Sequence, residues 1–131
     1  KHTLWLPDWR GNNRMDSLRN IVSDGRVSLM FMISGSNNVV RVNGTANLTA
    51  QIEITSQFDK NNKSPRSVIV VTVNEIYFQC AKALMRSKLW VSGDNSKGIP
   101  TAGQFIQELR DDFDAESYDE RYPEYAKDRM W

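Results

Sequence analysis

Residues 9–25 read WRGNNRMDSLRNIVSDG and join a strand to a helix. The preceding run from Thr3 to Pro7 is apolar and ends at a proline, which is typical of a strand terminus. Gly11 and the two asparagines after it supply turn chemistry, with an Asn side chain as the expected helix N-cap. Apolar residues then recur at helical spacing and predict a helix over residues 14–23, closed by Gly25 as its C′ residue. These apolar residues are Met15, Leu18, Ile21 and Val22.

A candidate anion site lies where this strand, turn and helix meet. Arg10, Arg14 and Ser17 group around the helix start, where free N–H groups and the helix dipole favour a phosphate or a carboxylate. Arginine adds a permanently charged donor that can bind such groups with two hydrogen bonds. Arginines at helix starts are also common as solvated surface groups, so the spacing alone leaves both interpretations open.

Composition is that of an ordinary globular domain. The chain has 131 residues, of which 40% are hydrophobic and 25% charged, enough for one domain with a substantial core. No apolar run approaches the roughly 20 residues of a membrane-spanning helix, so we expect a cytoplasmic protein without membrane contacts.

The scarcity of cysteine and histidine limits which metal sites and catalytic arrangements the chain can form. Cys80 is the only cysteine, which excludes an internal disulfide, and His2 is the only histidine, which argues against a Cys/His metal site. A Ser/His/Asp or Cys/His catalytic arrangement is disfavoured for the same reason. We expect Cys80 to be buried and inert, as free cysteines commonly are.

Charge is divided unevenly along the chain. Residues 1–91 carry 12 Lys and Arg against 6 Asp and Glu, whereas residues 92–131 carry 5 against 10. A basic body with an acidic tail can indicate nucleic-acid binding, but here the basic residues are scattered and no aromatic–basic interleaving is present. We therefore expect no nucleic-acid partner. Self-association, or pairing of the tail with the body, explains the charge division as well.

The remaining patterns predict a small antiparallel β-barrel with attached helices. Residues 26–34 are apolar on both faces and read as a central, doubly covered strand, while residues 39–48 alternate with a core face. That core face is formed by Val40, Val42, Gly44, Ala46 and Leu48. Residues 66–79 are rich in β-branched and aromatic residues and predict a long strand that bends near Asn74 and Glu75.

Short helices are expected around these strands. Residues 49–58 predict a helix over one barrel mouth, and residues 80–86 predict one or two helical turns. Thr101 and Gln104 form a plausible capping box before an apolar stripe. A last helix is expected from Ala115 to Met130, interrupted or restarted at Pro123.

Three sequence blocks resemble the pyridoxamine 5′-phosphate oxidase-like flavoproteins, and more narrowly a bacterial branch of FMN-dependent enzymes within them. The first is LWLPD at residues 4–8 followed by GNNRMDSLRNI at 11–21. The second is VRVNGTA at 40–46, and the third is FQCAKAL at 78–84 with RS at 86–87 and LW at 89–90. The blocks occur in the family's order, and the tail after residue 90 adds little to the resemblance.

The resemblance implies an FMN-binding split β-barrel that forms a homodimer, with one FMN in each of two grooves at the interface. The flavin phosphate would lie at the strand-to-helix junction, which coincides with the anion site derived above. The implied phosphate ligands are Asn12, Asn13, Arg14 and Ser17. Related branches place a lysine near the position of Ser17, so here Arg14 would supply most of the positive charge.

Other residues are implied with less definite roles. Pro7 and Asp8 would lie along the ribityl chain, and Arg41 would reach the isoalloxazine edge or the phosphate. Lys82 would face the flavin pocket, a partner subunit or solvent, and Trp90 would cover the cofactor or pack in the core or interface. No metal site is implied, and the sequence does not identify catalytic residues.

The expected domain layout is that of an incomplete barrel with a tail. Residues 1–91 would form the C-terminal two-thirds of the split barrel, because the family has earlier strands that this sequence does not match. Residues 92–131 would form a loop and helical tail packed on the same domain. The expected function is an FMN-dependent oxidoreductase with an unknown small-molecule substrate. The alternatives are a flavin- or haem-binding protein without turnover and a plain dimeric interaction domain.

Overall fold

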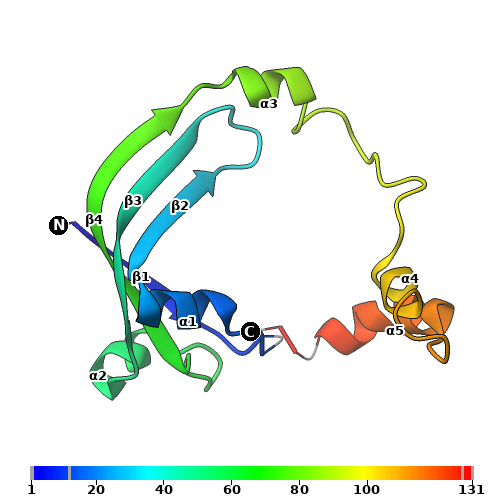
Figure 1. Ribbon diagram of the computed structural model, residues 1–131, viewed down its shortest axis with the longest axis horizontal. Coiled ribbons are helices and arrows are strands. Elements are labelled where there is room, and N and C mark those ends of the chain that lie inside the picture. The colour runs from blue at the N-terminus through cyan, green and yellow to red at the C-terminus, as the bar shows by residue number, and fades with distance from the viewer. Residues whose placement is uncertain (1, 12, 128, 131) are drawn as a thin grey trace. The chain divides into compact units, whose positions relative to one another are not determined.

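The chain forms two compact units, Lys1–Ser92 and Gly93–Met130. The computed structural model describes residues 2–11, 13–127 and 129–130. The first unit carries the β-sheet and three short helices, and the second carries two helices (Figure 1). Each unit is described by itself below.

Four antiparallel strands form one curved sheet in the first unit (Figure 1). The strands are β1 (Thr3–Asp8), β2 (Arg26–Met32), β3 (Val39–Thr49) and β4 (Ser67–Gln79), in the spatial order β1-β4-β3-β2. The first strand of the sequence therefore pairs with the last one. The predicted antiparallel barrel-type fold is confirmed as a curled half-barrel.

The core follows from the alternation of side chains along β3 and β4. Val42 and Ala46 on β3 are buried, and Val68 and Val71 on β4 are completely inaccessible to solvent. Burying a valine side chain contributes roughly 1.5–3 kcal/mol, so these few positions provide much of the sheet's stability. Val40, at the end of the predicted core face, is instead exposed.

A β-bulge bends β4 where the sequence predicted a bend. The pairing register shifts between Asn43 and Gly44, so that Asn43 faces Glu75 and Gly44 faces Val73. Asn74 is the extra residue, and such a bulge increases the local twist and curvature of a strand. The prediction of a bend near Asn74 and Glu75 is confirmed.

The prediction of β2 as a central strand covered on both faces is wrong. The strand pairs only with β3 and forms one edge of the sheet, and its last residues Met30, Phe31 and Met32 are exposed. An apolar run on both faces indicates burial, but the sequence does not reveal whether a neighbouring strand or another molecule supplies the cover.

Four helical segments surround or follow the sheet of the first unit. They are α1 (Asp16–Ser23), α2 (Ile52–Thr55), the 3₁₀ turn Ser56–Phe58 and α3 (Lys82–Ser87). In Figure 1, α1 and α2 lie at one end of the sheet and α3 lies at the other. The rings of Trp5 on β1 and Phe58 after α2 are 6.4 Å apart, so the 3₁₀ turn packs beside the edge strand.

Two details of α1 differ from the prediction. The helix begins at Asp16 with Met15 as N-cap, and no described side chain caps it; the proposed asparagine cap is therefore wrong for Asn13, and Asn12 lies outside the described residues. Asp24 is the C-cap, and Gly25 follows it without a positive φ angle.

Gly25 is required by a close approach of two backbones. Its carbonyl accepts a hydrogen bond of 2.6 Å from the N–H of Ala46, and a Cβ on Gly25 would lie 2.7 Å from the carbonyl oxygen of Ala46. A real Cβ does not approach a backbone oxygen so closely, so this contact fixes how α1 leads into β2.

The second unit is a helical pair, α4 (Ala102–Gln107) and α5 (Ala115–Lys127). The predicted capping box is present, since the Thr101 hydroxyl accepts from the N–H of Gln104 and the Gln104 side chain accepts from the N–H of Thr101. Asp119 on α5 accepts hydrogen bonds from the Thr101 hydroxyl and from the N–H of Gly103, which ties the two helices together.

Pro123 does not interrupt α5, contrary to the prediction. The helix runs through it from Ala115 to Lys127. A proline removes one intrahelical donor, but the surrounding turns can retain their own hydrogen bonds. None of the described helices is both long enough and apolar enough to cross a membrane.

Replacing Gly25 with alanine should destabilise the first unit by about 1–3 kcal/mol, because the new methyl group forces two backbones apart. Gly11→Ala is the matched control, since a Cβ there would meet only the Trp9 carbonyl oxygen at 3.9 Å. Chemical denaturation of both variants measures the difference. Equal stability of the two variants would show that the approach of Gly25 to β3 is not a constraint.

Candidate functional site

The end of β1 is anchored to the start of β4. The Asp8 carbonyl accepts a hydrogen bond of 3.1 Å from the N–H of Arg66, and the Asp8 carboxylate accepts one of 3.1 Å from the Ser67 hydroxyl. Pro7 and Asp8 are half-buried and pair with Val68 and Ser67. These bonds hold the end of β1, and therefore the start of the following turn, in a fixed position.

The turn after β1 leads into a helix start that none of the described side chains caps. Asn13 has a φ angle of +62°, a left-handed conformation that asparagine tolerates better than most residues. The first hydrogen bond of the helix runs from the N–H of Arg19 to the carbonyl of Met15, at 2.9 Å. The N–H groups of the first turn precede that bond, and no described side chain caps them.

Exposed polar side chains surround this helix start. Arg14 and Ser17 are both exposed beside the first turn of α1. Asp16 is the first residue of the helix, and its carboxylate interacts favourably with the helix dipole. The same negative charge would repel a bound anion. The arrangement suits an anion that approaches from the Arg14 side and accepts backbone hydrogen bonds.

The other predicted residues, Arg41, Lys82 and Trp90, lie on or beyond the other part of the sheet. Arg41 on β3 is half-buried and donates from Nε to the Gln79 side chain at 2.9 Å. Lys82 is exposed on α3, and the half-buried Trp90 donates from its indole nitrogen to the Ser36 carbonyl at 2.7 Å. Trp90 thus holds the segment after α3 against the β2–β3 connection.

The strand register places the end of β1 and Arg41 at different positions along the sheet. Asp8 pairs with Ser67, and Arg41 pairs with Tyr77, ten residues further along β4. At about 3.3 Å per residue this corresponds to roughly 30 Å of strand, although curvature shortens the direct path. Pro7, Asp8, Asn13, Arg14 and Ser17 therefore lie at the end of β1 and in the turn and helix that follow it, whereas Arg41 lies ten residues further along the strands and Lys82 and Trp90 follow the far end of β4.

Two residues differ from what the sequence suggested. Arg66 was not selected from the sequence, yet its backbone N–H binds the end of β1, which brings a further exposed arginine next to Asp8. Cys80 was expected to be buried and is exposed, because it follows the end of β4 rather than lying within it.

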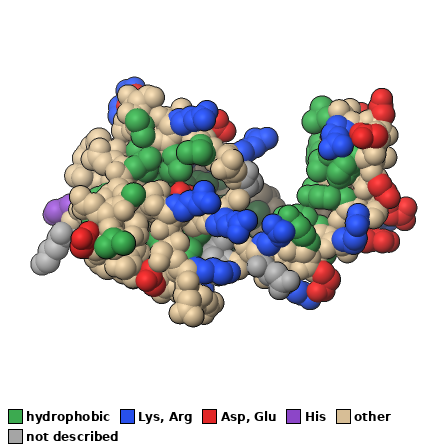
Figure 2. Space-filling model, turned by 90° about the horizontal axis from the view of Figure 1, so that it is seen from below, with side chains coloured by type: hydrophobic (Ala, Val, Ile, Leu, Met, Phe, Trp, Pro, Cys, Tyr) green, Lys and Arg blue, Asp and Glu red, His purple; other side chains and the backbone are tan. Residues whose placement is uncertain are grey.

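Figure 2 views the molecule from the end of the sheet at which α1 and α2 lie, and it shows Lys and Arg side chains gathered on the first unit. A positive surface of this kind raises the local concentration of anions and is screened by salt. The positive charge of this surface is the charge that an anion site at the start of α1 requires.

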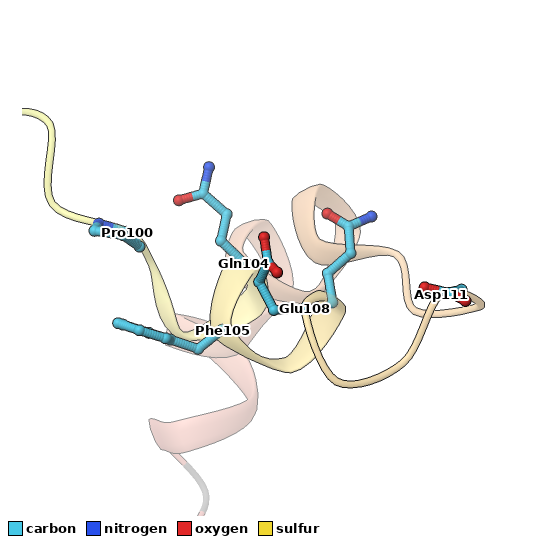
Figure 3. A pocket seen from close by; sticks show the side chains of 6 residues that line it. Pro100, Gln104, Phe105, Glu108 and Asp111 are labelled. Carbon is cyan, nitrogen blue, oxygen red and sulfur yellow. The ribbon is translucent and has the colours of Figure 1, made fainter.

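Two surface hollows lie elsewhere and do not coincide with the predicted residues. The larger, about 640 Å³, belongs to the second unit and is lined by Phe105, two glutamines and two carboxylates (Figure 3). The carboxylates of Glu108 and Asp111 make it unsuitable for a phosphate. We therefore place the candidate site at the α1 start on chemical grounds rather than in this hollow.

The smaller hollow, about 500 Å³, lies beside the bulge in the first unit. Asp24 and Arg26 form an exposed ion pair on its rim, and hydrogen bonds from the Arg26 side chain and backbone lower the pKa of Asp24 to about 2. Asn43 donates to the Glu75 carboxylate at 2.7 Å across the neighbouring strands. These groups are already paired with one another, so they favour a structural role.

Comparisons with known proteins agree with this fold. Among solved structures, a 1.98 Å crystal structure of a HupZ variant from Group A Streptococcus is similar, with a TM-score of 0.51 and 16% sequence identity. The match covers 60% of this chain and 68% of the HupZ chain, and at this identity it shows a shared fold alone. No curated protein sequence matches the chain significantly. A family model described as pyridoxamine 5′-phosphate oxidase matches residues 1–80. Because this match covers more than half of the sequence, the chain belongs to the pyridoxamine 5′-phosphate oxidase family.

Proposed function

We propose that the chain is an FMN-dependent oxidoreductase that binds the flavin phosphate at the start of α1. The proposal rests on the first turn of α1, which no described side chain caps and which begins beside Arg14. A phosphate there would accept hydrogen bonds from backbone N–H groups and a charge-assisted bond from the guanidinium. Family membership supports the choice of FMN among phosphate-bearing ligands.

The residues around this turn fit the proposed ligand. Asn13 and Ser17 offer polar side chains beside Arg14, and Pro7 with Asp8 would line the path of the ribityl chain. The anchoring of Asp8 to Ser67 would keep that path rigid. Asn12 remains part of the proposal, although it lies outside the described residues.

The bound flavin would supply the electron transfer, and the protein would supply binding, orientation and the local electrostatic environment. Arg14 would neutralise the phosphate charge and fix one end of the cofactor. The substrate is a small molecule that the described residues do not identify.

A homodimer would bring the two separated groups to one cofactor. Arg41 lies ten residues further along β4 than the end of β1, and Lys82 and Trp90 follow the far end of β4, so we propose that a partner subunit contributes these three residues to the site around Arg14. In that arrangement Arg41 and Lys82 would face the flavin ring and Trp90 would border it.

An exposed apolar row supports this dimer. Phe31, Val40 and Phe78 lie side by side across three strands, and Ile76 precedes Phe78 on the same face. Their exposed fractions are 41%, 38%, 83% and 65%. Contiguous apolar patches on a protein surface commonly mark interfaces, so this row is the proposed dimer contact.

Haem binding without turnover is the second candidate. Haem iron usually takes an axial ligand from His, Cys, Met or Tyr; the only histidine and the only cysteine lie outside residues 7–17, and Met15 is the one residue of these four types within them. The helix start suits a phosphate, which FMN carries at the end of its ribityl chain. A plain dimeric interaction domain would bind neither cofactor.

Arg14→Ala should weaken FMN binding by about 2–3 kcal/mol, or roughly 30- to 150-fold, because it removes a charge-assisted bond to the phosphate. Arg19→Ala is the control, since Arg19 lies one turn further along the helix, and it should cost far less. Riboflavin, which lacks the phosphate, should bind wild type and Arg14→Ala about equally. Flavin fluorescence titrations measure all of these affinities, and a riboflavin loss that matches the FMN loss would refute the phosphate contact.

The purified protein should absorb in the visible range as a bound flavin does. Oxidation of a reduced nicotinamide or a pyridoxamine-type substrate would distinguish an enzyme from a binding protein. Haem uptake without flavin uptake would favour the second candidate, and uptake of neither would favour the interaction domain.

Phe78→Lys should convert the dimer to a monomer without unfolding it, because the side chain is already largely exposed within one chain. Ile52→Lys is the control, since Ile52 is 75% exposed on α2, at the other end of the sheet. Sedimentation velocity of both variants gives the answer. A Phe78→Lys protein that remains dimeric would show that the apolar row is not the interface.

A further inference from the structure

Three tyrosines form a continuous stripe along α5. Tyr118, Tyr122 and Tyr125 recur at helical spacing, with ring centroids 5.6 Å and 6.3 Å apart along the series. Beyond the last ring, the Arg129 guanidinium lies 4.0 Å from the centroid of Tyr125. At the other end, Phe113 lies 5.3 Å from Tyr118. We refer to the three tyrosines as the tyrosine stripe.

The C-terminal part of the stripe is left uncovered by the rest of the second unit, whereas Tyr118 is half-buried beside Phe113. The contact of α5 with α4 is made through Ala115, which is 7% exposed, and through Asp119. Tyr122 and Tyr125 remain about half exposed. Hydrophobic side chains are correspondingly visible on the second unit in Figure 2.

We propose that the tyrosine stripe pairs with the same stripe of a second copy, with the two α5 helices antiparallel. A two-fold axis between positions 121 and 122 would place Tyr118 against Tyr125 of the other copy, twice by symmetry. Stacked or tilted aromatic pairs would then continue from one helix to the other.

Charge at the ends of α5 favours this orientation. Asp114 precedes the helix and accepts from the N–H of Ser117 as its cap, and Asp111 and Asp112 lie just before it. Arg129 follows the helix at the other end. The antiparallel register places Arg129 opposite Asp114 of the second copy, whereas a parallel register would place like charges together.

Nucleic acid and a cationic protein match the tyrosine stripe less well than a second copy of the chain does. Residues 92–131 carry 5 basic against 10 acidic residues, so nucleic acid would be repelled. A cationic partner protein would match the net charge, but it would leave Arg129 opposed to a like charge. Three rings on each side form a small interface, so the contact would be weak and dependent on concentration.

This inference is independent of the proposed FMN function, and cross-linking tests it directly. In a Cys80→Ser background, Arg121→Cys places a thiol at the border of the stripe, three residues from Tyr118 and four from Tyr125. Glu120→Cys is the matched control, because its side chain points about 160° away from those of Tyr118 and Tyr122, on the far side of the helix from the stripe. A short bismaleimide should join two Arg121→Cys chains on the order of tenfold faster than two Glu120→Cys chains, because pairing raises the effective concentration of the thiols.

Two further variants complete the test. Adding Tyr125→Ala to Arg121→Cys should slow dimer cross-linking several-fold, while circular dichroism confirms that the helix is retained. Adding Phe78→Lys should leave the cross-link in place, which separates this contact from the proposed barrel dimer. Equal rates for Arg121→Cys and Glu120→Cys, or no dimer product from either, would overturn the proposal. Loss of the cross-link in Phe78→Lys would also overturn it, since proximity would then come from the barrel contact.

Discussion

The pairing of β4 with both β1 and β3 is the constraint on which the first unit depends. Val71 sits between Leu4 of β1 and Ala46 of β3 and is completely buried. Because this register is fixed by a dry core, a slip of one residue would turn every buried side chain outward. The same register sets where β1 ends, and therefore where the turn into α1 begins.

That geometry explains why the candidate site has two separate parts. The end of β1 and the start of α1 present backbone donors and Arg14 at one end of the sheet, while Arg41, Lys82 and Trp90 lie toward the other. A curled half-barrel with exposed apolar residues on its far end fits a protein that completes its site by association. Family membership accounts for the fold, whereas the cofactor and the dimer remain our proposals.

Several local features of the fold could be predicted from the sequence, whereas the spatial order of the strands could not. The alternation of β3, the bend near Asn74 and the capping box at Thr101 each depend on residues close in sequence. The edge position of β2 depends on which strands pair, and the sequence pattern does not contain that information. Likewise the candidate anion site was found from Arg14 and the helix start, but the role of Arg66 depends on its pairing with Asp8, 58 residues away.

Amide chemical shifts report whether the first turn of α1 binds the phosphate of FMN. In ¹H–¹⁵N spectra of labelled protein, FMN should shift the amides of Asp16, Ser17 and Leu18 downfield, because a phosphate oxygen accepts their hydrogen bonds. Riboflavin at saturation should leave these three amides nearly unchanged while it shifts others. If FMN and riboflavin change these three chemical shifts equally, or if FMN binds without changing them, the phosphate does not bind at the first turn of α1.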